Sequence, residues 1–396
     1  MGYKDKKIIN VCMIAYTEYY TDARIKSYVT GLNDNGIKVY LYCLKDSFSK
    51  KDSENNLNLI FLQNKYQGKN ALLYIFFYLF FFIKAFFAVS IGFFKYKFDV
   101  VHVHNMPDFI VFCAFVPKIF GKKIILDMHD VMTATFDTKF HGIGNKVIRK
   151  IILLQSIIST FFSDVLICTN KSQLIYLENE GLKSENTKIF LNLPNANYFR
   201  KRTIIPNNNY FSLIYHGTIT ERLGLDLIVK AVELASKHID VRLSIIGDGE
   251  LKNELIEYCK FNNLFYDIVV FYPFIPVNKL QKELKKHDAG IIGNRKSELT
   301  QKIMLPVKLM EYIAVGLPVI SPNLEVIREH IDEDMVLYYE ADDVKDMANK
   351  ILLLSKDSKL RENIIANSQR FFKSYNWERQ KMEYVGLIKS LIGEDK

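Results

Sequence analysis

Short apolar runs alternate with amphipathic helical segments along most of this 396-residue chain. Because a strand buried on both faces of a parallel sheet has a nearly continuous apolar sequence, each run predicts a buried strand. The runs are KIINVCMIAY, KVYLYCL, LNLIFLQ, DVVHVHN, KKIILDMHD and DVLICTN in the first half, and FSLIYHGT, VRLSIIGDGE, IVVFYPF, DAGIIGN, LPVISP and MVLYYE in the second. The repeated alternation predicts an α/β fold with two doubly wound sheets, whose ligands lie at the carboxyl ends of the strands.

The stretch FRKRTIIPNNNY, residues 199–210, interrupts the alternation, because it is basic, then rich in asparagine, and lacks periodicity. A chain of this length usually forms two domains. We therefore expect a first domain over residues 1–200, a linker over 201–210 and a second domain over 211–374. Residues 375–396 contain NWERQKMEYVGLIKSLI, whose apolar positions form one stripe, so we expect a terminal helix that packs back onto the first domain.

The segment ALLYIFFYLFFFIKAFFAVSIGFF, residues 71–94, is long enough to span a bilayer. The strand FDVVHVHN follows immediately and needs its sheet neighbours on the same side of a membrane. We expect a helix with one face on the sheet and surplus Phe available to lipid, flanked by Lys84, Lys95 and Lys97. A transmembrane helix and a helix wholly buried against the sheet are the alternatives.

A second basic and apolar segment, NKVIRKIILLQSIISTFF at residues 145–162, adds to this surface. The formal net charge of +9 and the pI of about 9.0 favour an anionic partner: nucleic acid, phospholipid headgroups or a phosphorylated substrate. No zinc-finger, RRM-like or basic-zipper pattern is present in the sequence, so nucleic acid is not expected. Together these features predict a cytoplasmic protein held peripherally at the anionic inner face of the cell membrane.

The five cysteines are scattered and never form a C-x-x-C pair, so the sequence indicates neither a disulfide framework nor a zinc site. This fits a reducing compartment. The first residues lead from charged positions directly into a strand-like run, and we expect no secretion signal.

The stretch LPVKLMEYIAVGLPVI, residues 305–320, predicts a short helix between Pro306 and Gly316 that carries Lys308 and Glu311 one turn apart. A helix amino end with a lysine suits a diphosphate, and a carboxylate one turn deeper suits a pair of ribose hydroxyls. The alternative is a solvated surface ion pair between the two side chains.

Two strand-end turns of the second half are candidates for anion binding. YHGTITERLGLDL places a glycine at a strand end and then Arg222 and Gly224 at a helix start, where backbone amides and a guanidinium can face an anion. IIGDGE, residues 245–250, repeats the pattern, and a tight turn without a ligand is an equal alternative there.

Six segments resemble, in order, the retaining nucleotide-sugar glycosyltransferases of family 4. They are YYTDARIKSYVTGLNDNGIKVYLY, DVVHVHNMPDFIVFCAFVPKIFGKKIILDMHD, YHGTITERLGLDL, LSIIGDGELKNEL, PVKLMEYIAVGLPVI and NWERQ. The resemblance implies the GT-B fold, in which two Rossmann-like domains face a cleft. It also implies transfer of a sugar from a nucleotide diphosphate to an acceptor, with the anomeric configuration kept.

In this resemblance Glu311 matches the glutamate that binds the donor ribose, and Arg222 matches an arginine that meets the diphosphate. His129 matches the histidine beside the reacting sugar and the acceptor. The full set of expected site residues is as follows: catalytic His129, Arg222 and Lys308; donor-binding Gly217, Thr218, Arg222, Asp248, Phe274, Ile275, Leu305, Lys308 and Glu311; acceptor-side Arg24, Asn105, Asp108 and His129.

The chain departs from the common family pattern at two positions. The family's second glutamate, eight residues before Glu311, is replaced by Ile303, and the lysine that often follows the arginine is replaced by Leu223. This chain looks like a subgroup with the pattern P-x-K-x-x-E-Y. We expect Lys308 to replace the missing cation. Arg222, Lys308 and helix dipoles can stabilise a diphosphate, so no metal cofactor is expected.

The resemblance, together with the positive net charge, therefore implies a hexosyl- or N-acetylhexosaminyltransferase that uses a nucleotide-sugar donor and a lipid-linked saccharide acceptor in bacterial surface polysaccharide synthesis. One alternative is a catalytically degenerate glycosyltransferase-like partner protein, because of Ile303 and Leu223. The other is a metal-dependent hydrolase, which would require a barrel fold and would use four strand-end histidines: His102, His104, His129 and His216.

Overall fold

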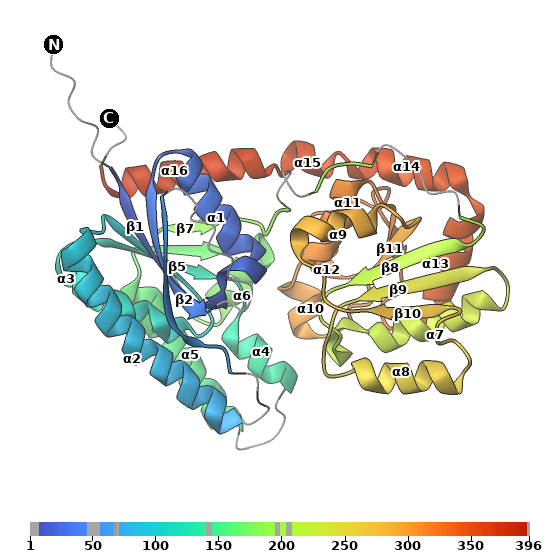
Figure 1. The fold of residues 1–396 in the computed structure, drawn as a ribbon, viewed down its shortest axis with the longest axis horizontal. Helices are drawn as coiled ribbons and strands as arrows, with labels where there is room; N and C mark the ends of the chain where they lie inside the picture. Colours follow the sequence, from blue (N-terminus) through green and yellow to red (C-terminus); the bar gives the residue numbers. More distant parts are fainter. Residues whose placement is uncertain are drawn as a thin grey trace, which may run out of the picture. The chain divides into compact units, whose positions relative to one another are not determined.

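The computed structural model describes residues 8–45, 56–66, 68, 71–139, 145–194, 199–202 and 208–393. The chain divides into two compact units (Figure 1). Unit 1 comprises Met1–Asn192 and Glu378–Lys396, and unit 2 comprises Leu193–Trp377. Part of the expected linker, residues 203–207, lies outside the described residues.

Unit 1 contains a seven-stranded sheet in the order β3-β2-β1-β4-β5-β6-β7, in which every neighbouring pair is parallel. The strands are β1 (Asn10–Glu18), β2 (Lys38–Lys45), β3 (Leu57–Asn64), β4 (Val100–His104), β5 (Lys123–Met128), β6 (Val165–Cys168) and β7 (Thr187–Ile189). The first six confirm the predicted strands. The edge strand β7 has only three residues, one of them a lysine, and gives no apolar run for a sequence pattern to detect.

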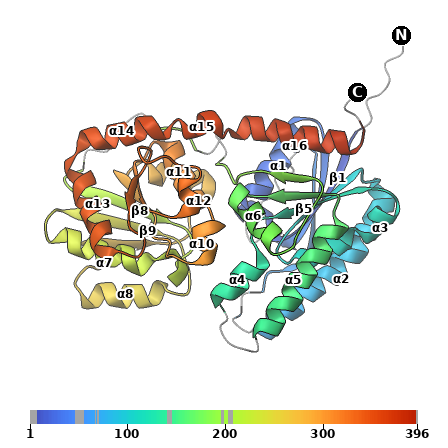
Figure 2. The ribbon, with the colours of Figure 1, turned by 180° about the vertical axis from the view of Figure 1, so that it is seen from behind.

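The two faces of this sheet carry different helices. Helices α1 (Ala23–Asp34) and α16 (Trp377–Leu391) cover one face, where Tyr28, Leu32, Tyr384 and Ile388 join the strands in one hydrophobic core. Helices α2 (Ala71–Tyr96) and α5 (Asn145–Phe162) lie side by side on the other (Figures 1 and 2). The remaining elements are η1 (Tyr19–Thr21), η2 (Asp108–Ala114), α3 (Phe115–Ile119), α4 (Met132–Lys139) and α6 (Lys171–Asn179).

Helix α2 packs on the sheet through one stripe of buried side chains, Phe81, Ala85 and Val89. Its ends connect β3 to β4 within a single sheet, so a helix that crossed a bilayer would separate strands that are hydrogen-bonded through β2 and β1. Only 22% of its 18-residue apolar stretch is buried inside the protein. Both alternatives, the transmembrane helix and the wholly buried helix, are therefore wrong for this fold.

Unit 2 contains a six-stranded parallel sheet in the order β10-β9-β8-β11-β12-β13. The strands are β8 (Phe211–His216), β9 (Val241–Ile246), β10 (Val269–Tyr272), β11 (Ala289–Ile291), β12 (Val319–Pro322) and β13 (Leu337–Tyr339). The helices are η3 (Glu221–Leu223), α7 (Leu225–Ser236), α8 (Lys252–Phe261), α9 (Val277–Leu284), α10 (Glu298–Lys302), α11 (Val307–Val315), α12 (Glu325–Arg328), α13 (Val344–Lys356), α14 (Ser358–Ser368) and α15 (Phe371–Ser374). Two doubly wound Rossmann-like units are thus confirmed.

Candidate active site

The turns at the carboxyl end of the second sheet pack backbone against backbone. Gly217, directly after β8, and Gly247, directly after β9, have φ of 118° and 150°, values that favour glycine. A Cβ at Gly247 would lie 2.0 Å from the Gly217 carbonyl oxygen, and one at Gly249 would lie 2.2 Å from the Ile219 oxygen. The glycines of IIGDGE therefore allow two turns to touch, which explains them without a ligand.

A similar contact joins the turns after β8 and β11. Gly224 has φ of 61°, and a Cβ there would lie 1.9 Å from the carbonyl oxygen of Gly293. The Arg295 amide donates to the Arg222 carbonyl at 3.1 Å. The Arg222 turn is thus fixed beside the segment that follows β11.

Lys308 lies in the first turn of α11, which begins directly after Pro306 and ends at Gly316 in the left-handed conformation. Its Nζ donates to the Tyr215 hydroxyl at 2.8 Å and lies 3.9 Å from the centre of that ring. A Cβ at Gly217 would lie 3.3 Å from Nζ, so the glycine leaves room for the ammonium group. The strand end of β8 and the amino end of α11 therefore meet at this lysine.

Glu311 pairs with a residue other than Lys308. Its Oε2 accepts from His216 Nε2 at 2.6 Å, and both side chains are buried. The Tyr312 hydroxyl lies 3.1 Å from His216 Nδ1 and fixes the other side of the ring. The alternative of a solvated Lys308–Glu311 surface ion pair is therefore wrong. Within the described residues Glu311 Oε1 accepts no hydrogen bond, so this oxygen can face a ligand.

Two cations lie close together at this point. Burial lowers the pKa of Lys308 to about 7; Glu311 acts to raise it and Arg222 to lower it further. Neither Lys308 nor Arg222 forms an ion pair with any residue in the described ranges. An anion bound between them would relieve the repulsion and restore the full charge on the lysine.

The other predicted donor contacts do not all gather here. Thr218 is exposed, and its carbonyl accepts from the Tyr215 hydroxyl at 2.7 Å. Asp248 is 81% exposed and accepts from the Gly249 amide. Leu305 is half-buried just before Pro306, and Phe274 is 53% exposed. Ile275 lines a cavity of about 1030 Å³ whose lining includes none of the other predicted donor residues.

The sequence reasoning missed Asn294, which lies just after β11. Its side chain is completely buried, and neither amide atom has a hydrogen-bond partner among the described residues. An unpaired buried amide is costly, and its position beside the Arg222 turn makes it a candidate ligand contact. The only sequence signal was a polar residue at the end of the strand-like run DAGIIGN.

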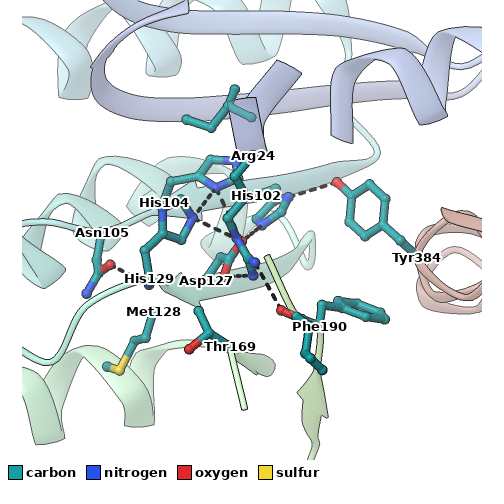
Figure 3. Close-up of polar contacts among 12 residues, drawn as sticks. Arg24, His102, His104, Asn105, Asp127, Met128, His129, Thr169, Phe190 and Tyr384 are labelled. Atoms are coloured by element: carbon teal, nitrogen blue, oxygen red, sulfur yellow. Dashed lines mark hydrogen bonds and ion pairs between the residues drawn. The ribbon is translucent and has the colours of Figure 1, made fainter. Parts of the chain in front are cut away.

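In unit 1 a single buried carboxylate organises the carboxyl ends of β4 and β5 (Figure 3). Asp127 accepts from Arg24 Nη2 at 2.9 Å and from Arg24 Nε at 3.2 Å. His104 Nδ1 lies 3.4 Å from Asp127 Oδ2, and His129 Nε2 lies 3.2 Å from it. The geometry brings together Arg24 and His129, which the sequence predicted, with Asp127, which it did not assign to the site.

The remaining acceptor-side residues hold the turn that carries His129. Asn105 Oδ1 accepts from the His129 amide at 2.7 Å, and Asn105 Nδ2 donates to Asp108 Oδ1 at 2.8 Å. Asp108 Oδ2 in turn accepts from Ser156 at 2.5 Å. Burial raises the pKa of Asp108, and the hydrogen bonds from Ser156 and Asn105 oppose that shift.

Charge in this cluster is concentrated on one pair. Burial would raise the pKa of Asp127, but the charge of Arg24 and the nearby histidines hold it well below its usual value. Burial also lowers the pKa of His102 and, more strongly, that of His104, so both rings are neutral near pH 7. Arg24 and Asp127 therefore form the charged centre, and His129, which is less buried, lies at its edge.

The metal-hydrolase alternative does not fit this geometry. His102, His104 and Asp127 offer ligand atoms within 4.8 Å of one another. However, Arg24 already neutralises Asp127, and a divalent cation would add two charges beside a buried guanidinium. His216 is hydrogen-bonded to Glu311 in unit 2, and the described strands form two open sheets, not the barrel that this alternative required.

The comparisons with known proteins agree with the resemblance found in the motifs. Residues 198–371 match the family model described as Glycosyl transferases group 1. An uncharacterised glycosyltransferase of Methanocaldococcus jannaschii is 24% identical over 56% of this chain and 58% of its own length. The chitobiosyldiphosphodolichol beta-mannosyltransferase of Candida albicans is 20% identical over 67% of this chain and 62% of its own length. These matches thus span less than two thirds of either relative.

Solved structures match over nearly the whole chain. Sucrose-phosphate synthase from Thermosynechococcus elongatus has a TM-score of 0.77 at 15% identity and covers 97% of this chain and 99% of its own. The HepE protein of Anabaena in complex with UDP-glucose has a TM-score of 0.74 at 13% identity, with 96% and 100% covered. The chain has the GT-B fold. Membership of the P-x-K-x-x-E-Y subgroup stays a prediction.

The Arg24–Asp127 pair makes a prediction about stability. Replacing Asp127 by Asn leaves a buried guanidinium without a counter-charge, and we expect the free energy of unfolding to fall by about 3–5 kcal/mol in urea denaturation. The control is Asp34→Asn, because Asp34 is 52% exposed and its pair with Lys381 should contribute less than about 1 kcal/mol. Equal small losses in the two variants would contradict the central role of Asp127.

The depressed pKa of Lys308 makes a prediction about pH. Because the lysine is charged below about pH 7 and loses its proton above it, binding of a diphosphate probe such as UDP should weaken as the pH rises from about 7 to about 8.5. We expect a loss of up to about tenfold per pH unit, measured by calorimetric titration. Lys308→Arg keeps its charge throughout this range and should flatten the dependence. A slope shared by both proteins would exclude Lys308 as its source.

Proposed function

We propose that this protein is a retaining glycosyltransferase, which transfers a hexosyl or N-acetylhexosaminyl group from a nucleotide diphosphate sugar to a lipid-linked saccharide. One observation carries the proposal: Lys308 at the amino end of α11, and Arg222, whose charge lowers the pKa of that lysine, form no ion pair within the described ranges, and the buried carboxylate of Glu311 lies one turn further along the same helix. This combination suits a nucleoside diphosphate, which has two phosphates and a ribose diol. The likeness to a structure that holds UDP-glucose supports the same donor class.

Each group has a distinct part in donor binding. Arg222 and Lys308 contact the diphosphate, together with the free amides at the start of α11. Glu311 accepts hydrogen bonds from the ribose hydroxyls through Oε1, while His216 holds Oε2 in place. Gly217 keeps the turn close to the diphosphate, since any side chain there would press on the lysine.

The same cations serve the reaction itself. As the bond from the anomeric carbon to the diphosphate breaks, negative charge grows on the leaving group and positive charge grows on the sugar. Lys308 and Arg222 stabilise the leaving group more strongly in the transition state than in the bound donor. Because the protein supplies this charge, we propose that transfer requires no tightly bound metal ion.

On the acceptor side, we propose that His129 meets the reacting groups. Arg24 and Asp108 are buried, and their polar atoms are engaged by other protein groups, so we assign them to positioning. Asn105 fixes the backbone of His129. The name of the Candida relative describes a lipid-linked acceptor, which supports that class of acceptor for this chain. The role in bacterial surface polysaccharide synthesis rests on the motif resemblance.

The degenerate-partner alternative rests on Ile303, where the family usually has a glutamate, and on Leu223, where it often has a lysine. Ile303 is 3% exposed, so an acidic side chain there would need buried partners. The donor-sugar contacts that such a glutamate makes must come from other groups, and Asn294 is a candidate. Turnover of a nucleotide sugar by the purified chain separates an active enzyme from a degenerate partner.

The first test measures nucleotide release from UDP-, GDP- and ADP-sugars and then compares two variants. Glu311→Gln should weaken nucleoside diphosphate binding by about ten- to a hundredfold, because it removes a charged hydrogen-bond partner. Lys308→Ala should slow the chemical step by about a hundredfold and affect donor binding less, because its main effect is on the leaving group.

Glu254, an exposed glutamate of α8, provides the matched control as Glu254→Gln, which should bind and react like the parent. Assays with added chelator test the metal-free proposal in the same experiment. Parental affinity and rate in both site variants would remove Lys308 and Glu311 from the active site. Absence of turnover with every donor and acceptor tried, despite tight nucleotide binding, would favour the degenerate partner.

The second test concerns His129. His129→Ala should lower kcat by at least about tenfold while the KM for the donor stays nearly constant, because the side chain meets the reacting groups rather than the nucleotide. The matched control is His238→Ala, at an exposed position after α7. If His129→Ala lowers the melting temperature and the donor affinity together with kcat, the residue has a structural role instead.

A further inference from the structure

Three helices of unit 1 expose an unusual number of large apolar side chains. On α2 the exposed residues recur at helical spacing and form one stripe along its length, and α3 and α5 add further ones. We call this surface the apolar face. Its members are Leu73, Ile75, Phe76, Leu79, Phe80, Ile83, Phe87, Ile91 and Phe94 on α2, Phe115, Ile119 and Phe120 on and after α3, and Val147, Ile148, Ile151, Leu154, Ile158 and Phe161 on α5.

These helices form one continuous layer. Both α2 and α5 pack on η2, through ring contacts of Phe82 with Phe109 at 5.6 Å and of Phe112 with Phe162 at 5.1 Å. Phe120, just beyond α3, contacts Phe94 at 5.5 Å. Figures 1 and 2 show α2 and α5 side by side from opposite views. The exposed residues therefore lie on neighbouring helices rather than on separate parts of the surface.

The apolar face is not the outside of an ordinary soluble domain. Soluble monomers rarely expose contiguous apolar patches larger than a few hundred square ångströms, and larger ones mark a partner or a membrane. The helix Leu73–Tyr96 is long and apolar enough to cross a membrane, and only 22% of its 18-residue apolar stretch is buried. The exposed stripe of α2 is therefore a candidate docking surface.

The charge around the apolar face identifies the occupant. Lysines lie at the end of α2, after α3 and on α5: Lys95, Lys97, Lys122, Lys146 and Lys150. No described residue forms an ion pair with any of them. Neither 71–96 nor 145–162 contains an aspartate or glutamate. Nearby acidic groups are already engaged, since Asp164 pairs with Lys118 and Asp137 pairs with Arg149.

We propose that the apolar face docks in the plane of an anionic lipid bilayer, with α2 and α5 parallel to the membrane and the lysines at the phosphate headgroups. Snorkelling lysines around an apolar stripe are the arrangement of interfacial helices. A second copy of the chain is a poorer occupant, because a symmetric contact would bring the two lysine rims together. The proposal does not depend on the sugar-transfer activity.

The test is flotation of the full-length protein with vesicles of phosphatidylcholine alone and of phosphatidylcholine with about 30% phosphatidylglycerol. We expect binding to the anionic vesicles that falls with added salt. Ile91→Asp and Ile151→Asp, at positions 68% and 62% exposed, should each reduce bound protein by at least about tenfold. The matched control is Phe261→Asp on α8, where the side chain is 88% exposed but lies outside the apolar face.

A second readout places the face within the lipid. The chain has one tryptophan, so Ile151→Trp and Phe261→Trp each add one new signal to a constant background. Brominated acyl chains should quench the added tryptophan at 151 and leave that at 261 unchanged. Circular dichroism and UDP titration check that each variant is folded, and they also separate a failed docking surface from a failed nucleotide site.

Several results would overturn the proposal. These are an absence of vesicle binding, equal binding to neutral vesicles without salt dependence, or equal binding by the two Asp variants and the parent. A concentration-dependent dimer in light scattering that the Asp variants abolish, without vesicle binding, would instead make the face an interface between two copies.

Discussion

The first unit depends on one buried carboxylate. Asp127 lies near the end of the interior strand β5, where a charge without partners would cost several kcal/mol. Arg24, from α1, supplies the counter-charge and also donates to the Phe190 carbonyl, so one guanidinium links a helix, a strand and the segment that follows β7. His102 Nε2 lies 3.7 Å from Asp127 Oδ2, and His102 Nδ1 lies 2.8 Å from the Tyr384 hydroxyl. His102 therefore connects the same centre to α16. The orientation of His129 follows from this arrangement.

At the carboxyl end of the sheet in unit 2, positive rather than negative charge needs a partner. There the carboxylate of Glu311 is engaged by His216, while Arg222 and Lys308 have no acidic partner in the part of the chain described. Burial, together with the charge of Arg222, lowers the pKa of Lys308 to about 7, and Glu311 opposes this shift. Cations without an acidic partner are typical of a ligand site, because the ligand's charge offsets their unfavourable electrostatic free energy. A diphosphate has the negative charge to do so.

The exposed apolar side chains of α2 are a second departure from an ordinary soluble fold. Here the departure is in the burial of apolar surface and not in the pairing of charges. A folded domain normally covers its large apolar side chains and pairs its buried charges. Here Phe87 and Ile91 are exposed along a helix that has already packed its opposite stripe on the sheet. The proposed nucleotide site and the proposed lipid-docking surface rest on these two features.

The sequence by itself determined twelve of the thirteen strands found in the described residues, since a strand buried in a parallel sheet is apolar along its length. It also determined the short helix with Lys308 and Glu311, because Pro306 and Gly316 limit that helix through their own backbone preferences. Both features depend on the local sequence, so they can be predicted without knowing which residues they contact in the folded chain.

Only the tertiary structure decided which groups meet. Glu311 pairs with His216, which lies 95 residues away in the chain, and Arg24 pairs with Asp127, 103 residues away. The glycines of IIGDGE serve backbone contact with the preceding turn, and the unpaired amide of Asn294 is visible only once its surroundings are known. The reason is physical: a charge or an amide selects its partner by distance and burial in the folded chain, and neither quantity is written in the spacing of residues along the sequence.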